Sequence, residues 1–307
     1  MKVYVYGNTL NSAYHLTKAL REKGIDAEFF LDQSSSYEQD FPWWDDPSIN
    51  ENNLPSWIHY YKAVPFFLLP DKETKKMIRD FSACDIALVS CYGPMLAMKA
   101  KVPFVFYSLG SDLNMISLKN DFRAVLHNSQ DITGKFRKLI KIITYSPLQQ
   151  WALKKYAKRI IVYMGYQYNP FIVAYNLQHK THKLCYPKDV INYSVPVDEE
   201  LKKKYVKYKV VFFMFSRHTW SSAWNEYKGN DKFLRAFAKF VKEKNPNVLL
   251  ITSNKGIDIE KSKKIINDEN IDSYVEWIND LPKYLFKKYQ SLPNMVMVDN
   301  FWHNQWY

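Results

Sequence analysis

Apolar runs and helical segments alternate along the chain, and this order restricts the fold more than any other feature. At the start, residues 2–6 form a β-rich run that ends at Gly7, and the apolar residues of 12–23 recur at helical spacing. Gly24 follows, where a helix commonly ends, and 25–31 form a second apolar run. A strand, a helix and a strand in this order predict a parallel sheet.

Strands and helices alternate along the rest of the chain, and the alternation starts anew after residue 205. Strands are predicted at 84–90, 102–108, 160–163, 190–194, 210–215, 248–252, 274–278 and 295–298. Further helices are predicted at 95–100, 231–243, 260–266 and 281–289, and 33–75 are expected to form a long connection. We therefore predict an α/β protein with two doubly wound parallel-sheet domains, residues 1–205 and 206–307.

The composition favours a folded protein without a metal centre. Hydrophobic residues make up 47% of the chain, and the three cysteines form no metal-binding spacing. The N-terminus lacks the apolar core of a signal peptide, and polar residues and Pro170 interrupt the most apolar later window. A cytoplasmic protein with reduced thiols is expected.

The excess positive charge is concentrated in residues 132–188. The net charge of the chain is +12, yet this window holds eleven Lys or Arg residues and no Asp or Glu. Aromatic residues are interleaved with the basic ones, which suits contact with an anionic membrane surface. A solvated basic face over a core helix is the alternative, and single-stranded nucleic acid is a further one.

Basic residues flank the first predicted crossover of the C-terminal domain. Arg217 follows the strand at 210–215, and Lys228 and Gly229 precede the next helix, with Asn230 or Asp231 as its cap. A helix N-terminus binds anions, and a guanidinium grips two phosphate oxygens. The pattern predicts a diphosphate site, although a solvated loop with two ordinary basic residues has the same spacing. The predicted donor-binding residues are Ser216, Arg217, His218, Lys228, Gly229 and Asn230.

Several segments resemble GT-B glycosyltransferases, particularly the retaining group called family 4. The segment SRHTW…KGNDKFLRAFAKF is similar to the donor site of that family, and residues 274–301 resemble its next strands. MKVYVYGNTLNSAYHLTKAL is similar to its first crossover, whose early loop faces the acceptor, and VPFVFYSLGSDLN resembles a segment that usually reads HGSD. The resemblance implies acceptor contacts from Gly7, Asn8, Asn11, Ser12, Ser108 and Asp112, although Asn8, Asn11, Ser12 and Asp112 could equally be helix caps.

Two departures from the family pattern affect the expected activity. Leu109 occupies the position of the family's His, so that hydrogen bond is lost or moved. The family's glycine-rich turn and paired glutamates would follow Tyr307, so we expect a truncated donor domain and little turnover.

The resemblance implies a retaining hexosyltransferase that moves a sugar from a UDP- or GDP-sugar to a hydroxyl of a glycan or lipid-linked acceptor. Arg217 and Lys228 would stabilise the leaving diphosphate, without a metal or cofactor. The expected location is the cytoplasm, at the inner membrane face. The alternatives are a non-catalytic sugar- or lipid-binding protein and a sugar-nucleotide epimerase of the same fold.

Overall fold

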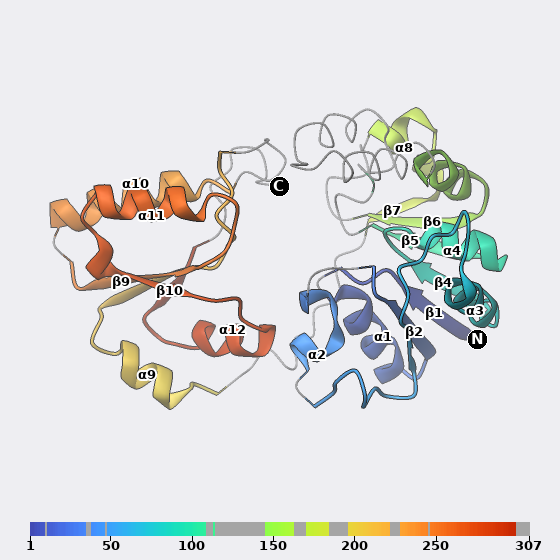
Figure 1. Cartoon of the computed structure of the whole chain (residues 1–307), viewed down its shortest axis with the longest axis horizontal. Helices are drawn as coiled ribbons and strands as arrows, with labels where there is room; N and C mark the ends of the chain where they lie inside the picture. Colours follow the sequence, from blue (N-terminus) through green and yellow to red (C-terminus); the bar gives the residue numbers. More distant parts are fainter. Residues whose placement is uncertain are drawn as a thin grey trace. The chain divides into compact units, whose positions relative to one another are not determined.

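The chain folds into two compact units, Met1–Asp189 and Val190–Tyr307 (Figure 1). The computed structural model describes residues 1–9, 11–34, 38–46, 48–108, 113, 145–162, 170–183, 196–221, 228–244 and 246–298. Asp112, the predicted strand at 190–194 and much of the basic window lie outside these residues.

The first unit contains a seven-stranded parallel sheet in the order β3-β2-β1-β4-β5-β6-β7. Its strands are β1 (Lys2–Tyr6), β2 (Asp26–Asp32), β3 (Ile58–Tyr61), β4 (Ile86–Val89), β5 (Phe104–Tyr107), β6 (Ala157–Val162) and β7 (Thr181–Lys183). The helices are α1 (Ser12–Glu22), η1 (Glu38–Asp40), α2 (Pro42–Asp45), α3 (Lys72–Phe81), α4 (Gly93–Ala100), a segment at 145–155, α8 (Pro170–Ala174) and η3 (Gln178–Lys180).

Side chains on both faces of this sheet are buried, as a doubly wound fold requires. Tyr4 and Tyr6 of β1 pack in one core with residues of α3 and α4, whereas Val5 packs in another with Ala13 and Tyr14 of α1. Helix α1 ends at Glu22 with Lys23 as its C-cap, and Gly24 follows with a φ of 77° and donates its N–H to the carbonyl of Arg21. The predicted end of this helix is therefore confirmed.

The second unit contains a smaller, four-stranded parallel sheet in the order β10-β9-β8-β11. Its strands are β8 (Val210–Met214), β9 (Val248–Ser253), β10 (Val275–Ile278) and β11 (Met295–Met297). Its helices are α9 (Glu199–Tyr205), α10 (Asn230–Lys244), α11 (Ile259–Asp268), η5 (Asp272–Tyr274) and α12 (Lys283–Gln290). Helices α10 and α11 pack on one face, and α9 and α12 on the other (Figure 1).

The boundary between the units lies before α9, not after it as predicted. Tyr205 is buried in the core of the second unit, and its hydroxyl donates to Glu276 at 2.8 Å. Asn294 also donates to the carbonyl of Tyr205 at 3.0 Å. These contacts assign α9 to the second unit.

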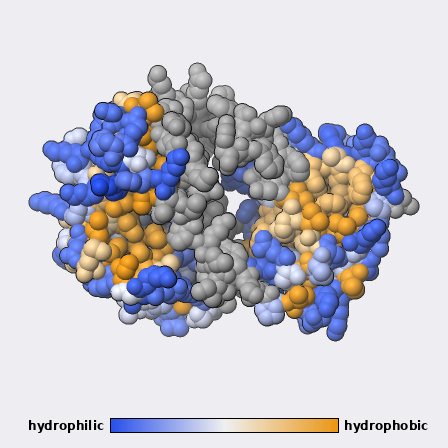
Figure 2. Space-filling view, turned by 180° about the vertical axis from the view of Figure 1, so that it is seen from behind, coloured by the Kyte–Doolittle hydropathy of each residue, from blue (hydrophilic) through white to orange (hydrophobic). Residues whose placement is uncertain are grey.

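Hydrophobic side chains reach the surface of both units (Figure 2). Val296 and Met297 on β11, an outer strand of the described sheet, are 44% and 40% exposed. None of the helices in the described part of the chain combines the length and hydropathy that a bilayer crossing requires.

Candidate functional site

The strand order of each sheet locates one position where a ligand is expected. In the second unit β9 and β10 lie on one side of β8 and β11 lies on the other, so the connections diverge next to the carboxyl end of β8. Ligands of open α/β sheets bind at such switch points. Residues 215–221 follow β8, and they include Ser216, Arg217 and His218 of the predicted donor-binding residues.

Asn230, the first residue of α10, connects the segment after β8 to the start of this helix. Its side chain is 1% exposed, and its amide nitrogen donates to Ser216 Oγ at 3.2 Å. Its side-chain oxygen accepts from the N–H of Thr219 at 3.3 Å, and Lys228 donates its own N–H to the Thr219 carbonyl at 2.7 Å. The structure therefore brings the segment after β8 against the start of α10.

Gly229 gives the chain the conformation that this contact needs. Its φ of 69° lies in the left-handed region, and it is buried immediately before the helix. Arg217 and Lys228, one in each of the joined segments, are both half-buried. Lys228 precedes α10 by two residues, and a cation next to a helix N-terminus favours a bound anion.

His218 is directed into the core instead of toward a ligand. Its side chain is fully buried, with Nδ1 2.9 Å from Ser262 Oγ and Nε2 3.0 Å from Thr252 Oγ1. Burial lowers the pKa of His218 to about 4, so the ring is neutral at physiological pH. Since both ring nitrogens are occupied, His218 has a packing role, and the expected phosphate contact from its side chain is wrong.

Asp258 binds the far end of the segment after β8, at Trp220 and Ser221. The sequence pattern did not indicate this residue. Its carboxylate accepts from the N–H groups of Trp220 and Ser221, both at 2.8 Å, and pairs with Lys261 at 3.0 Å. Burial raises the pKa of Asp258, but these hydrogen bonds outweigh it and lower the pKa to about 2. Asp258 stands far from Trp220 in sequence, so neither spacing nor periodicity could reveal the contact.

The first unit has its own switch point between β1 and β4, next to the loop Gly7–Ser12. Gly7 has a φ of 97°, and a Cβ there would lie 2.4 Å from Ser90 Oγ. Asn8 accepts the N–H groups of Ala13 and Tyr14 at 3.1 and 3.3 Å, so it caps α1.

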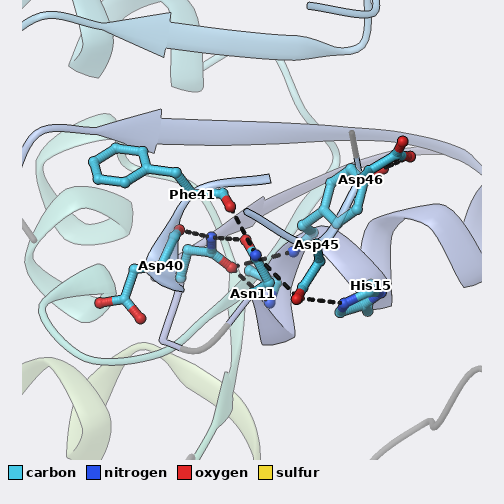
Figure 3. Close-up of polar contacts among 9 residues, drawn as sticks. Asn11, His15, Asp40, Phe41, Asp45 and Asp46 are labelled. Carbon is cyan, nitrogen blue, oxygen red and sulfur yellow. Dashed lines mark hydrogen bonds and ion pairs between the residues drawn. The ribbon is translucent and has the colours of Figure 1, made fainter. Parts of the chain in front are cut away.

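Residues 40–45 form hydrogen bonds with this loop (Figure 3). Asn11 is fully buried, and its amide donates to the Phe41 carbonyl at 2.7 Å and to Asp45 Oδ2 at 3.1 Å. His15 Nε2 lies 3.1 Å from the same Asp45 oxygen. The side chain of His15 is 26% exposed and that of Asp45 is 3% exposed, so a buried carboxylate orients a partly exposed imidazole.

The remaining predicted acceptor residues in the described part of the chain are buried or half-buried. Gly7 and Ser108 are buried. Ser12 Oγ is buried and has no hydrogen-bond partner among the described residues. It borders a cavity of about 10 Å³, which has room for one water and not for a sugar. Asn8 is half-buried, and its side chain is engaged within the loop: its oxygen caps α1 and its amide donates to Asn11 Oδ1 and to the Asp40 carbonyl.

The described residues contain no group of three or more His, Cys, Asp or Glu side chains placed to hold a metal ion.

No protein-family model and no curated protein sequence matches the chain.

Solved structures of two-domain GT-B proteins share this fold. HepE from Anabaena, crystallised with UDP-glucose, is similar with a TM-score of 0.61 and 14% identity, over 95% of this chain and 72% of that one. WaaG, a glycosyltransferase involved in lipopolysaccharide biosynthesis, has a TM-score of 0.55 and 12% identity, over 95% and 74%. Sucrose-phosphate synthase from Thermosynechococcus elongatus has a TM-score of 0.54 and 10% identity, over 95% and 73%. The chain therefore has a GT-B fold, with the second sheet smaller than the first.

Proposed function

We propose that this protein binds a UDP- or GDP-sugar at the start of α10 and transfers its sugar to an acceptor hydroxyl. The observation that carries the proposal is the pair of half-buried cations, Arg217 and Lys228, at the switch point of the second sheet. The UDP-glucose complex of HepE, which shares the fold, supports a nucleotide sugar as the ligand.

The proposed chemistry is electrostatic. When the bond between the sugar and the diphosphate breaks, negative charge grows on the leaving diphosphate. Arg217 would hold two of its oxygens, Lys228 would add a second positive charge, and the positive end of the α10 dipole would face the same anion. Asn230 and Gly229 would contribute indirectly, because they fix the backbone on which these groups stand. Retention at the anomeric carbon follows from the family resemblance alone.

The acceptor is proposed to bind the first unit at the loop Gly7–Ser12. Asn8 and Ser12 are the half-buried predicted residues of this loop, and His15 is a candidate that the structure adds. Asp45 occupies Nε2 of His15 and leaves the other ring nitrogen for an acceptor hydroxyl. A glycan or a lipid-linked sugar is the proposed class of acceptor.

Calorimetric titration of the full chain with UDP and with GDP tests the donor site. We expect Arg217→Gln and Lys228→Gln each to weaken binding by about 10- to 100-fold, the effect of losing one charge-assisted hydrogen bond. Arg235→Gln and Lys239→Gln are matched controls, since each removes an exposed, ion-paired cation of α10. Wild-type affinity in both site variants, or no binding of either nucleotide, would overturn the proposal.

Turnover separates an enzyme from a binding protein. A panel of UDP- and GDP-sugars with candidate acceptors, followed by detection of the released nucleotide, measures transfer. Binding without any release of nucleotide would favour the non-catalytic alternative.

A further inference from the structure

We propose that the outer face of helix 145–155 and the turn into β6 dock on an anionic lipid surface. This basic aromatic face belongs to the first unit and is independent of the proposed donor site. Its members are all exposed: Trp151, Lys154, Lys155, Tyr156, Lys158 and Arg159.

Two aromatic side chains at the centre of this face are unusually accessible. Trp151 is 43% exposed and Tyr156 is 38% exposed, and their rings meet edge to face with centroids 5.0 Å apart. Trp and Tyr combine an apolar ring with a polar group, which is why they gather where a membrane meets water. The pair suits the headgroup region of a bilayer.

A lysine lies over both rings. Lys155 Nζ is 5.3 Å from the centre of the Trp151 ring and 5.6 Å from that of Tyr156. The two rings contact each other and share this cation, so neither forms the open stacking platform that a nucleic-acid base requires. This geometry favours a lipid surface over single-stranded nucleic acid.

A bulge at the start of β6 adds two more cations to the face. Phe104 of β5 pairs with Ala157, but the next residue, Val105, pairs with Arg159, so Lys158 is an extra residue in the strand. Bulges redirect side chains, and here both Lys158 and Arg159 are exposed although they are neighbours in a strand.

Among the residues that the structure describes, no acidic side chain pairs with the cations of this face. The sequence has no Asp or Glu between Ile132 and Lys188. In the described part of the first unit, Lys155, Lys158 and Arg159 form no ion pair, whereas Lys239, Lys263 and Lys264 of the second unit each pair with a carboxylate. An uncompensated positive surface is complementary to anionic headgroups.

The helix beneath this face is held rigidly. Ala152 and Leu153 are fully buried, so the opposite side of the helix is anchored in the core. Lys180 is buried and donates to the carbonyls of Leu153 and Lys154 at 2.6 and 2.8 Å, which caps the end of the helix. Lys180 therefore stabilises the face and is not part of its exposed charge.

The basic aromatic face and the loop of residues 7–12 lie at opposite ends of the strands of the first sheet. The aromatic pair lies at the amino end of β6, whereas the loop Gly7–Ser12 and Ser108 follow the carboxyl ends of β1 and β5. In a parallel sheet these are opposite edges. Docking through the basic aromatic face would leave the first loop uncovered.

Sedimentation of the full chain with lipid vesicles tests the proposal. We expect binding to vesicles of phosphatidylcholine with phosphatidylglycerol, and much weaker binding to phosphatidylcholine alone. The triple variant Lys155→Gln, Lys158→Gln, Arg159→Gln should bind anionic vesicles about 100-fold more weakly, at about fivefold for each basic side chain. The control Lys239→Gln, Lys263→Gln, Lys264→Gln removes the same charge from paired lysines and should bind almost as wild type.

Fluorescence quenching by brominated phosphatidylglycerol reports on Trp151 directly. We expect quenching in the wild type and a clear reduction in Trp151→Phe, which keeps an aromatic ring. Equal binding to neutral and anionic vesicles, an equal loss in the control triple variant, or unchanged quenching in Trp151→Phe would overturn the proposal. Tighter binding of a single-stranded oligonucleotide than of anionic vesicles, lost in the first triple variant, would also overturn it.

Discussion

At the scale of single residues, the absence of a side chain at Gly256 determines how closely two segments of the second unit approach. Gly256 has a φ of 124°, and a Cβ there would lie 2.2 Å from the carbonyl oxygen of His218. The His218 N–H in turn donates to the Lys255 carbonyl at 2.7 Å. The loop after β9 thus supports the backbone beside Arg217.

Gly256→Ala is therefore expected to lower the free energy of unfolding by about 3 kcal/mol, through backbone strain and collision with a buried main chain. Gly24→Ala is the control, because Gly24 also has a positive φ but a Cβ there would meet nothing within 4 Å. It should cost only about 1 kcal/mol. Chemical denaturation compares the two, and an equal loss would contradict the role assigned to the close approach.

The buried His218 predicts a particular pH dependence of stability. Its pKa is about 4 in the folded protein against 6.5 in a model compound, because burial disfavours the charged ring. Between these values the unfolded chain binds more protons, so the free energy of unfolding should fall as the pH is lowered from about 6.5 to about 4. Above pH 6.5 this contribution is fully present.

Thermal unfolding at a series of pH values measures this effect. His218→Phe has no group that titrates there, so its stability should lack this part of the pH dependence whatever its value at neutral pH. Identical slopes for the variant and the wild type would exclude His218 as the cause.

At the scale of elements, one buried carboxylate joins α2 to the start of α1. Asp45 accepts from the Asn11 amide and lies 3.1 Å from His15 Nε2. Asp45→Ala would leave both groups without this partner, so we expect a loss of about 1–3 kcal/mol. Glu51→Ala, which removes an exposed partner of Lys62, should cost about 0–1 kcal/mol. Denaturant titration of both variants tests the difference, and similar losses would count against a structural role for Asp45.

The N-terminus of α10 gives a second prediction at this scale. Asn230→Ala removes the hydrogen bonds to Ser216 and Thr219, and we expect it to cost about 1–3 kcal/mol of stability, because it leaves buried polar groups unpaired. It should also weaken UDP binding, because the segment that carries Arg217 loses its attachment. Unchanged UDP affinity in a destabilised Asn230→Ala protein would show that these hydrogen bonds and the ligand site are independent.

At the scale of the whole molecule, ligand binding should affect the two units unequally. If UDP binds beside α10, hydrogen exchange should slow in residues 216–221 and 228–234 and remain unchanged in the first unit. Exchange measured by mass spectrometry with and without UDP tests this. Protection of residues 7–15 in place of the second-unit segments would assign the nucleotide to the other sheet.

Much of the fold could be predicted from the sequence because most elements carry a local signal. β1 and β8 have clear apolar runs, and Gly24 marks the end of α1. Helix α3 was missed because its buried face rests on few residues, Thr74, Met77 and Phe81, within a mostly charged segment. Strand β3 was missed for the related reason that its four residues lie in a long irregular stretch.

The candidate site was only partly predictable, since its supporting contacts join distant parts of the chain. Arg217 and Lys228 were indicated by their places beside a strand and a helix, and their role remains a prediction. Asp258 and Asp45 had no signal, because a hydrogen bond across more than thirty residues leaves no periodic trace. Only the structure could decide that His218 is directed into the core.

Hydrogen bonding between β8 and its neighbours ends at Met214, two residues before the first predicted donor contact. The backbone of the segment that follows is no longer paired as a strand, and side-chain contacts from Ser253, Asn230 and Asp258 keep it in place. We therefore expect substitution of Arg217, the proposed phosphate contact, to change the anion preference without altering strand pairing. We expect substitutions of the side chains in this crossover to alter ligand selectivity with little effect on folding.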